Sequence, residues 1–572
     1  MQKSQIKYPY GISNFEQLVQ DNYIFVDKTP FIELLESEER FSVFLRPRRM
    51  GKSLFLSILE YYYDIREKDK FEKLFSKYYI GQHPTPKANA YRVLKFDFSG
   101  IDSQTSESTY RSFLLSIRFA VSTFMENYEL FEEEDRVFIE AQETPAELMK
   151  AFFKLWKEQV DDETPIFLLI DEYDHFTNEI LIRDLTEFKK SVSEDGYVRK
   201  FYETIKIGTQ QGFIDRFFIT GVSPITMDSL TSGFNIVKHL TGKEEFHNMM
   251  GFSEEEVKVL LDLVLEDKDR METILEDMRL WYNGYRFNPE AKNSVYNSDM
   301  VLYFLDNFKK KQRYPTQMLD PNIMPDYNKL KQLFQVANYM QNMEVLEEIL
   351  EKGELSTKLI HQFSFAKPFD KIAFINLLYY LGNLTLKGET IYDIPCFVIP
   401  NYVIKELYWQ YYAYLLQENA GLTSDAYEVI RGMRQVADGD IGQLFELVQK
   451  LLEALSNRDF QRFDEKYVKM AIIAYAFQAE FYYIRSEREV TNDGYLDLEL
   501  LRHPKSSAQP HQYVLEIKYL KQAAEGQLKS TMAAAKKQLQ SYLAIDAELQ
   551  RMEKLKAIAV VVVKDQVHFE EC

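Results

Sequence analysis

Cysteine is almost absent from the 572 residues, because only Cys396 and Cys572 are present. Two cysteines are too few for a disulfide framework or a cysteine-built zinc site, which excludes the disulfide-rich secreted class. Long apolar runs are also missing: the most apolar stretch, Ala557–Val563, is far shorter than the roughly 20 residues that a membrane helix needs. Residues 1–17 contain no apolar segment of the signal-peptide type. We therefore expect a cytoplasmic protein without a membrane partner.

The chain also lacks a net positive charge, since 89 aspartates and glutamates outnumber 69 lysines and arginines and give a formal net charge of −20 at pH 7. Such a chain does not attract nucleic acid through a general positive field. Two segments are locally basic. Arg46–Ser53 holds three arginines, one lysine and no acid, and residues 516–540 hold five lysines against two glutamates. Any contact with DNA or RNA is expected to use these patches.

Apolar residues are plentiful, with 46% hydrophobic and 15% aromatic side chains. The length predicts two to four domains. In the first 250 residues, short apolar runs alternate with longer amphipathic ones, which is typical of helices layered on a parallel sheet. The predicted strands are Phe41–Leu45, Arg92–Phe98, Ile166–Ile170 and Arg216–Thr220, and the predicted helices include Leu54–Asp64 and Tyr197–Gln211. This pattern predicts an α/β domain over residues 1–250.

Residues 251–327 are expected to form a helical lid and a linker. The lid begins where Ser253 can cap a helix with an acidic first turn, and three prolines within 314–327 indicate the linker. Residues 328–430 are predicted to be helical and winged-helix-like, with a small hairpin made from 384–386 and 397–399.

Residues 431–572 are predicted to form a second α/β domain. A helical stretch, Asp438–Tyr483, is followed by two alternating runs, Tyr495–Leu501 and Tyr513–Leu520. A helix, Ala523–Leu543, and a strand, Ala557–Val563, complete the unit.

A phosphate-binding loop is predicted where the first strand meets its helix, in Arg46-Pro-Arg-Arg-Met-Gly-Lys-Ser53. Backbone N–H groups and the helix N-terminus form an anion cradle, Lys52 reaches the terminal phosphates, and Ser53 ligates magnesium. The first glycine of the usual pattern is replaced by Arg46, and a bare Gly-Lys-Ser also arises by chance. The predicted ATP-binding residues of this segment are Arg48, Arg49, Met50, Gly51, Lys52, Ser53 and Leu54.

Two further strand ends supply partners for the loop. Ile166–Ile170 delivers Asp171 and Glu172 to the carboxyl edge of the sheet, where ligands bind in open parallel sheets. We expect Asp171 to hold magnesium, Glu172 to polarise the attacking water, and Thr220 to sense the terminal phosphate. The alternative is that the two acids only begin a surface loop. His175 could contact nucleotide, although a loop histidine is more often simply exposed.

A carboxylate and lysine cluster is predicted near the C-terminus. Period-two alternation in Tyr513–Tyr519 places Glu516 and Lys518 on one face, and the preceding run presents Asp497. If the runs pair as a hairpin, Asp497 and Glu516 converge and invite Mg²⁺ or Mn²⁺, while Lys518 orients the nucleophile or stabilises developing charge. The alternative is a solvated, salt-bridged strand face.

Three residues are secondary candidates for this cluster. Gln538 and Tyr542, spaced i and i+4 on the predicted helix, lie on one face and could buttress the site or touch substrate. Glu487 is a further acidic candidate.

These motifs together resemble a family in which an AAA-ATPase-like domain precedes a PD-(D/E)XK nuclease superfamily domain. The resemblance rests on the following segments: Tyr10–Ile12, Val26–Thr29, Arg46–Ser53, Ile170–Asp174, Thr220–Pro224, Tyr282–Tyr285, Leu377–Gly382, Ile399–Asn401 and the set Asp497, Glu516 and Lys518.

The resemblance implies a P-loop fold in front and a nuclease fold behind, with Lys52, Ser53 and Asp171 serving nucleotide and magnesium. It also implies nuclease roles for Asp497, Glu516 and Lys518, and it explains the arginine-proline start of the loop, which is habitual in the family. One departure concerns the usual Gly-Arg-x-Asp entry to the first nuclease acid, which reads Asn492-Asp-Gly-Tyr-Leu-Asp497 here and lacks the arginine.

Three hypotheses for function stay open. In the first, the chain binds and hydrolyses ATP and thereby gates a magnesium-dependent nuclease site. In the second, it is a nucleotide-dependent switch or scaffold, able to form a homo-oligomer, whose rear domain binds a partner or nucleic acid without cutting it. In the third, the winged region around 377–404 binds DNA as a regulator.

Overall fold

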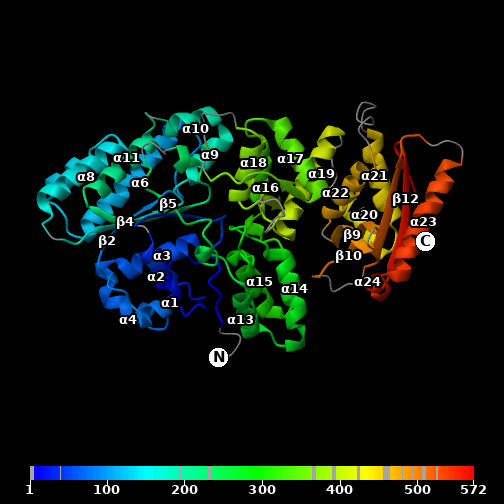
Figure 1. The fold of residues 1–572 in the computed structure, drawn as a ribbon, viewed down its shortest axis with the longest axis horizontal. Helices are drawn as coiled ribbons and strands as arrows, with labels where there is room; N and C mark the ends of the chain where they lie inside the picture. The colour runs from blue at the N-terminus through cyan, green and yellow to red at the C-terminus, as the bar shows by residue number, and fades with distance from the viewer. Residues whose placement is uncertain are drawn as a thin grey trace. The chain divides into compact units, whose positions relative to one another are not determined.

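The computed structural model describes the chain outside residues 1–5, 39, 162, 194, 230–233, 324, 362, 364–368, 389–393, 422–425, 455–463, 480, 492–493, 505–509 and 523–525. It divides into two compact units (Figure 1). The first unit comprises Met1–Arg313, Leu319–Val345 and Glu354–Tyr402. The second comprises Tyr314–Met318, Leu346–Gly353 and Val403–Cys572.

A five-stranded parallel sheet forms the centre of the first unit. Its order is β2-β3-β4-β1-β5, with bounds β1 Phe41–Leu45, β2 Arg92–Asp97, β3 Ile166–Asp171, β4 Ile214–Gly221 and β5 Lys238–His239. Every residue of β3 is buried, as its uninterrupted apolar sequence predicts for a strand covered on both faces. The four predicted strands are confirmed, whereas the two-residue edge strand β5 is too short to give a periodic signal.

Helices cover both faces of this sheet. Figure 1 shows α6, α8 and α11 on one face and α1 to α4 on the other. The helices of residues 1–250 are α1 Phe15–Gln20, α2 Phe31–Ser37, α3 Lys52–Tyr63, α4 Phe71–Phe75, α5 Tyr79–Gln82, α6 Ser106–Asn127, α7 Glu133–Glu140, α8 Pro145–Gln159, α9 His175–Arg183, α10 Leu185–Val192, α11 Tyr197–Gln210 and α12 Ile225–Ser229. This architecture confirms the predicted α/β fold class of the front domain.

Three helices follow the sheet, namely α13 Glu254–Val264, α14 Met271–Tyr282 and α15 Ser298–Lys311. The predicted cap is present, because the Ser253 hydroxyl accepts from the Glu256 N–H and the Glu256 carboxylate accepts from the Ser253 N–H. Asn297 caps α15 by a simpler arrangement, in which its side chain accepts from the N–H groups of Asp299 and Met300. These caps fix where α13 and α15 begin, and α15 begins beside the loop after β1, since the Ser298 hydroxyl donates to the carbonyl of Arg49. That these helices form a lid stays a prediction.

A small antiparallel sheet lies in the later part of the first unit. Its order is β6-β8-β7, with β6 Glu354–Ser356, β7 Thr385–Leu386 and β8 Cys396–Val398. The pairing of β7 with β8 confirms the predicted hairpin, and β6 is an additional strand. The neighbouring helices are α16 Pro325–Phe334, α17 Tyr339–Lys352 and α18 Lys371–Tyr380, and α17 runs across the boundary between the units.

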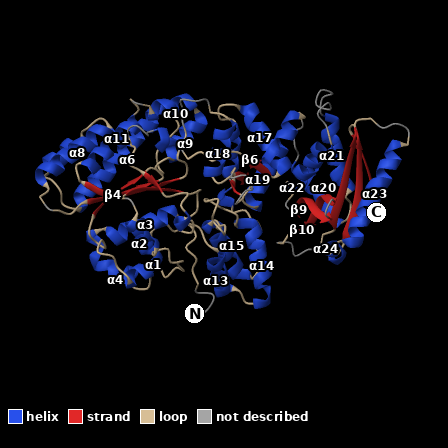
Figure 2. Cartoon of the chain, viewed as in Figure 1, coloured by secondary structure: helices blue, strands red, loops and turns tan. Residues whose placement is uncertain are grey.

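The second unit is built on a mixed five-stranded sheet of order β13-β12-β11-β10-β9 (Figure 2). The strands are β9 Tyr482–Thr491, β10 Gly494–Arg502, β11 Gln512–Leu520, β12 Leu555–Val563 and β13 Gln566–Glu571. Neighbours pair in antiparallel fashion except β11 and β12, which are parallel. The three predicted strands are confirmed.

The predicted helical stretch Asp438–Tyr483 is wrong beyond Phe477. Residues 482–491 form β9 because they pair with β10 along nearly its whole length, a long-range contact that local periodicity does not reveal. The helices of this unit are α19 Tyr402–Asn419, α20 Ala426–Asp438, α21 Gly442–Ala454, α22 Glu465–Phe477, α23 Gln527–Ile545 and α24 Ala547–Arg551. Helix α23 packs on the face of the sheet that presents Ala557, Ala559 and Val561. Within the described residues, no helix combines the length and apolarity required to cross a membrane.

Candidate functional sites

The loop between β1 and α3 has the backbone of an anion-binding turn. Gly51 has a φ of 92° and stands immediately before the first residue of α3, and Arg49 also has a positive φ, 65°. Only glycine adopts the Gly51 conformation without strain. The turn leaves the first N–H groups of α3 available to an anion, because helix N-termini carry unpaired donors and a partial positive charge.

Lys52 lies inside this loop and is only 3% exposed. Its Nζ donates to the carbonyl of Pro47 at 3.1 Å and lies 3.5 Å from Oε1 of Glu172. The ammonium is therefore held between the loop backbone and the acid that ends β3. A phosphate entering the loop would find a buried cation already positioned, with little side-chain freedom left to lose.

Arg46, at the position where a strict motif has glycine, serves the fold. It is 1% exposed and its guanidinium stacks between Phe44 and Phe287, at 4.1 and 4.0 Å from the ring centroids. It donates to the backbone carbonyls of Leu45, Thr241, Phe246 and His247. Arg46 is thus buried away from any exposed basic patch, and it ties the loop to the segment that follows β5.

Replacing Arg46 with alanine should destabilise the first unit by about 3 kcal/mol or more, because several buried carbonyls lose a charged donor and a cavity opens. Urea denaturation followed by tryptophan fluorescence measures this change. Arg40→Ala is the matched control, since Arg40 is 66% exposed and pairs with Asp215 at the surface, where a loss of about 0.5 kcal/mol or less is expected. Equal stabilities for the two variants would contradict the anchoring role.

Asp171 and Glu172 stand together at the carboxyl end of β3. The Ser53 hydroxyl donates a hydrogen bond to the Asp171 carboxylate, which partly offsets the rise in the pKa of Asp171 caused by burial. Burial also acts to raise the pKa of Glu172, but the positive charges of Lys52 and Arg48 and the hydrogen bond from Lys52 lower that pKa below its ordinary value. Glu172 is therefore kept ionised, as a residue that accepts a proton or orients water requires.

Thr220 is placed at the end of β4, where it pairs in register with Phe44 of β1. It is completely buried, and its hydroxyl has no hydrogen-bond partner among the described residues. A buried hydroxyl without a partner is unusual and calls for a ligand or a water molecule. Contact between Thr220 and a phosphate stays a prediction.

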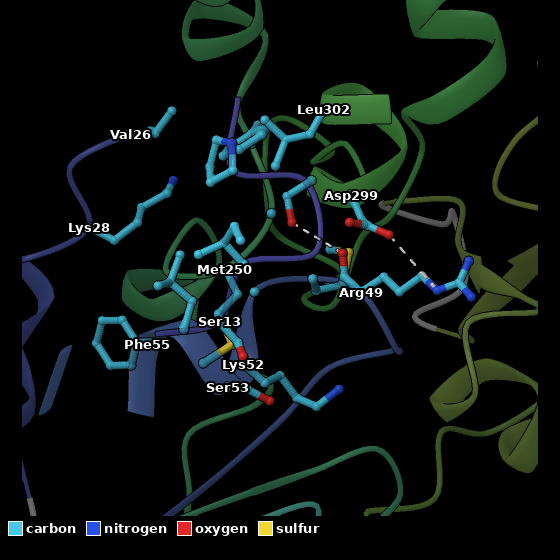
Figure 3. Close-up of a pocket in the computed structure, with 18 of the residues that line it drawn as sticks. Ser13, Val26, Lys28, Arg49, Lys52, Ser53, Phe55, Met250, Asp299 and Leu302 are labelled. Carbon is cyan, nitrogen blue, oxygen red and sulfur yellow. Dashed lines mark hydrogen bonds and ion pairs between the residues drawn. The ribbon is translucent and has the colours of Figure 1, made fainter. Parts of the chain in front are cut away.

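A cavity of about 320 Å³ opens beside the loop (Figure 3). Lys52 and Ser53 lie in its wall, together with Arg49, Met50, Gly51, Leu54 and Glu172. Most of the remaining lining is apolar: Pro9, Ile12, Ile24, Phe25, Val26, Phe55, Ile58, Met249, Met250, Phe252, Leu260 and Leu302. The cavity therefore combines polar and charged side chains of the loop with a largely apolar wall, as ligand pockets commonly do.

The cavity uses residues that the motif analysis did not assign to it. The segments 9–13 and 24–28 supply much of the apolar wall, and Lys28 is held there by Glu256 of α13 at 2.7 Å. Their resemblance to the family was the only sequence signal, because apolar residues before the first strand carry no chemical signature. Arg48, Asp171 and Thr220, which were predicted to bind nucleotide, are not among the residues that line the cavity.

In the second unit, the β10–β11 hairpin brings Asp497, Glu516 and Lys518 together. Lys518 Nζ lies 2.9 Å from Glu516 and 3.9 Å from Asp497. The N–H of Ile517 donates to Asp497 Oδ2 at 2.7 Å, which locks that carboxylate against β11. The convergence expected from two alternating strands is present, and the alternative of a solvated strand face does not describe Glu516, which is 1% exposed.

A third carboxylate reaches the same lysine. Glu465, in the first turn of α22, lies 3.4 Å from Lys518 Nζ. The sequence offered one overlooked signal, since Asp464 caps an apolar helix and places Glu465 next to the cap. The lysine therefore stands among three acids.

Glu516 carries the largest electrostatic perturbation of this cluster. Burial, followed by the charge of Asp497, raises its pKa to about 7. Its Oε2 is buried and has no hydrogen-bond partner among the described residues. A buried carboxylate oxygen without a donor is costly, so the cluster favours an additional cation at this point.

The secondary candidates lie around the cluster. On α23, Gln538 Nε2 donates to Tyr542 Oη at 2.9 Å, and Tyr542 Oη donates to the carbonyl of Tyr495 at 3.3 Å, two residues before Asp497. Glu487 on β9 forms an ion pair with Lys469 of α22. Gln538 and Tyr542 thus support the backbone of β10, and their contact with substrate stays a prediction.

Two family comparisons coincide with the two sites. Residues 9–231 match the family described as "Predicted AAA-ATPase", and residues 463–571 match the PD-(D/E)XK nuclease superfamily. The chain carries an AAA-ATPase-like domain followed by a PD-(D/E)XK nuclease superfamily domain. The first match includes the loop, Asp171 and Glu172, and the second includes Glu465 and the whole carboxylate and lysine cluster.

One relative with a similar sequence can be aligned to part of the chain. The chain is 27% identical over 375 residues to an "Uncharacterized protein in vnfD 5'region" of Azotobacter chroococcum mcd 1, an alignment that covers 62% of this chain and 63% of the relative. The chain thus spans less than two thirds of that relative's length.

Two of the solved structures that match the chain are an ATPase and a DNA-bound protein. A Walker-type ATPase of Pyrococcus abyssi has a TM-score of 0.38 and 9% identity, with 67% of this chain and 94% of the other covered. The Orc1 protein of Aeropyrum pernix, solved in complex with DNA, has a TM-score of 0.25 and 10% identity, with 70% and 93% covered.

Both domains offer hard oxygen ligands of the kind that Mg²⁺ prefers. In the ATPase-like domain these are the Ser53 hydroxyl and the Asp171 carboxylate, already joined by a hydrogen bond. In the nuclease domain they are Asp497 and Glu516, whose unpartnered Oε2 fits a cation. Within the described part of the chain, no group of three acidic, histidine or cysteine side chains has the spacing of a complete protein cage. Two carboxylates suit a hydrated Mg²⁺ that completes its shell with water and phosphate oxygens.

Stability of the metal-free protein should fall as the pH rises through about 7, because of Glu516. In the folded chain this group keeps a proton up to about pH 7, whereas its ordinary value is 4.5. Its favourable contribution is therefore complete below pH 4.5 and disappears as the pH passes 7. Melting temperatures of the wild type and Glu516→Gln in EDTA from pH 5.5 to 8.5 measure this change. The melting temperature of the variant should rise relative to that of the wild type as the pH increases. Parallel profiles would show that Glu516 titrates normally.

Proposed function

We propose that the chain binds ATP with Mg²⁺ at the loop, hydrolyses it, and thereby gates a metal-dependent nuclease site in its C-terminal domain. One observation carries the nuclease half: Asp497, Glu516 and Lys518 converge, and Glu516 keeps a buried oxygen without a donor. The ATPase half is supported by the buried Lys52 ammonium beside Glu172 and by the cavity that Lys52, Ser53 and Glu172 help to line. Nucleic acid is the proposed substrate class because this cluster suits a phosphodiester.

At the nucleotide site, the amide groups at the start of α3 and the Lys52 ammonium hold the phosphates. Ser53 and Asp171 hold Mg²⁺, which neutralises charge on the phosphate oxygens when bound. Glu172 accepts a hydrogen bond from the attacking water and aligns it with the terminal phosphorus. The apolar wall excludes water from the base.

At the nuclease site, Asp497 and Glu516 hold Mg²⁺ or Mn²⁺, which supplies a nucleophilic water and polarises the scissile phosphate when bound. Lys518 stays within reach of both acids and offers its ammonium to the charge that develops on the phosphate oxygens. The two carboxylates tolerate their mutual repulsion only with cations beside them. The lysines of the basic segment 516–540 add local positive charge that can contact the nucleic-acid backbone.

Cleavage assays on single-stranded and duplex DNA and RNA, with Mg²⁺ or Mn²⁺ and with or without ATP, test the proposal. Wild-type protein should cut at least one substrate, ATP should change the rate, and Lys518→Ala should lower it at least about 100-fold. Lys450→Ala, an exposed lysine on α21, serves as the matched control and should cut normally. A wild type that cuts none of these substrates under any nucleotide would rule out the nuclease half.

A second function is a nucleotide-dependent switch whose nuclease-like domain binds a partner or nucleic acid without cutting it. The contacts of Lys518 favour it, because the ammonium already compensates Glu516, Asp497 and Glu465. The missing arginine before Asp497 also favours it. Fluorescence anisotropy in EDTA distinguishes the two: tight binding that Mg²⁺ leaves unchanged, with no cleavage, supports the switch.

A further inference from the structure

His175 occupies a central place beside the nucleotide site. It is the first residue of α9, and its side chain is 19% exposed. Nδ1 lies 3.1 Å from Nη2 of Arg48 and 3.8 Å from Glu172, and Nε2 lies 3.5 Å from Glu179. The imidazole therefore joins the phosphate-binding loop, the end of β3 and the next turn of α9.

These contacts specify the protonation state of the ring. Arginine can only donate hydrogen bonds, so Nδ1 must present its lone pair to Arg48. An ionised glutamate can only accept, so Nε2 carries the proton that faces Glu179. The neutral ring with hydrogen on Nε2 satisfies both neighbours at once. Glu179 is itself held by the hydroxyl of Ser103, which fixes the orientation of the pair.

We propose that His175 is a positioning residue for ATP hydrolysis, acting as a neutral imidazole that holds the Arg48 guanidinium beside Glu172. The proposal rests on the hydrolysis proposed above. Arg48 is one of the positive charges that act on the Glu172 carboxylate, so the location of its guanidinium affects how that carboxylate can orient water. Without the Nδ1 acceptor, the Arg48 guanidinium loses one of the contacts that hold it in place.

The backbone of Glu172 has an unusual conformation. Its φ is 51°, a left-handed value that glutamate seldom adopts, and its carbonyl accepts from the N–H of His175 at 3.0 Å. The backbone N–H of His175 thus closes the turn that carries Glu172, whereas its imidazole contacts Arg48. Among the described residues, Arg48, Glu172 and Glu179 bring charged groups within 4 Å of the ring.

Steady-state ATP hydrolysis by two variants tests the proposal. His175→Ala removes the acceptor and should lower kcat at least about tenfold while KM changes less than about threefold, because Lys52 and the loop amides still hold the phosphates. His175→Asn places an amide oxygen near the position of Nδ1 and should keep kcat within about threefold of the wild type at pH 8. A protonated ring cannot accept from Arg48, so the wild type should lose rate in acid, whereas the asparagine variant should lose less.

His83, an exposed histidine directly after α5, provides the control. His83→Ala should leave kcat and its pH profile unchanged. Wild-type rates in His175→Ala, or an asparagine variant as slow as the alanine variant, would overturn the inference.

Histidine-selective ¹⁵N NMR at pH 8 gives a readout independent of turnover. Hydrogen on Nε2 of His175 is expected, and hydrogen on Nδ1 would also overturn the inference. A wild type that binds ATP without hydrolysing it, yet shows the expected tautomer, would instead contradict the proposed hydrolysis and remove the catalytic role of His175 with it.

Discussion

Lys52→Ala is expected to weaken ATP binding about 100-fold and to slow hydrolysis about 1000-fold, because a charged donor to the phosphates disappears from a buried site. The Lys52 ammonium lies between the Pro47 carbonyl and Glu172, with only 3% of the residue exposed. Its removal also leaves Glu172 without one of the charges that keep it ionised. Isothermal titration with ATP and Mg²⁺ measures the affinity, and phosphate release measures the rate.

Lys150→Ala is the matched control for this experiment, because Lys150 is an exposed lysine on α8 far along the chain from the loop. Circular dichroism should show both variants folded. Retention of wild-type affinity by Lys52→Ala would place the triphosphate elsewhere and remove the basis of the ATPase assignment.

Glu516→Gln should abolish metal-dependent cleavage, with a loss on the order of 1000-fold. The amide keeps the shape of the side chain but loses the charge that attracts the cation. It also removes the buried Oε2 carboxylate oxygen that lacks a donor in the structure. Cleavage of the preferred nucleic acid with Mg²⁺ in excess measures the loss, and Mn²⁺ titration shows whether metal affinity falls with it.

Glu570→Gln controls for the loss of one negative charge in the same domain, since Glu570 on β13 is 57% exposed and pairs with Lys536 at the surface. Its cleavage rate should match the wild type. If Glu516→Gln also cut at the wild-type rate, the cluster of Asp497, Glu516 and Lys518 would not be the nuclease site.

The parts of the fold that depend on local pattern could be predicted. An uninterrupted apolar run ending in two acids identified β3 with Asp171 and Glu172, and strict alternation placed Glu516 and Lys518 on one face of β11. The hairpin between β10 and β11 followed from two such runs, and its pairing brings Asp497 to the same place. Each of these predictions uses the pattern of side chains within one short run of sequence, and such a pattern reflects the local structure directly.

Other parts depend on contacts that only the folded chain creates. The polar residues of β9 gave no clear strand signal, yet the strand forms because β10 offers it a partner. Glu465 joins the nuclease cluster from a helix more than thirty residues before Asp497, at a distance that no motif spans. Arg46 stands where the strict loop pattern has glycine, a departure that the loop sequence alone does not explain. Its burial between two aromatic rings shows that it stabilises the fold.

A crystal of the wild-type protein grown with Mn²⁺ and a non-hydrolysable ATP analogue tests the central claim most directly. Anomalous scattering should reveal one manganese beside Ser53 and Asp171, with the base in the apolar cavity, and another between Asp497 and Glu516. A nucleotide bound away from Lys52, or no manganese at either pair of oxygen ligands, would contradict the account.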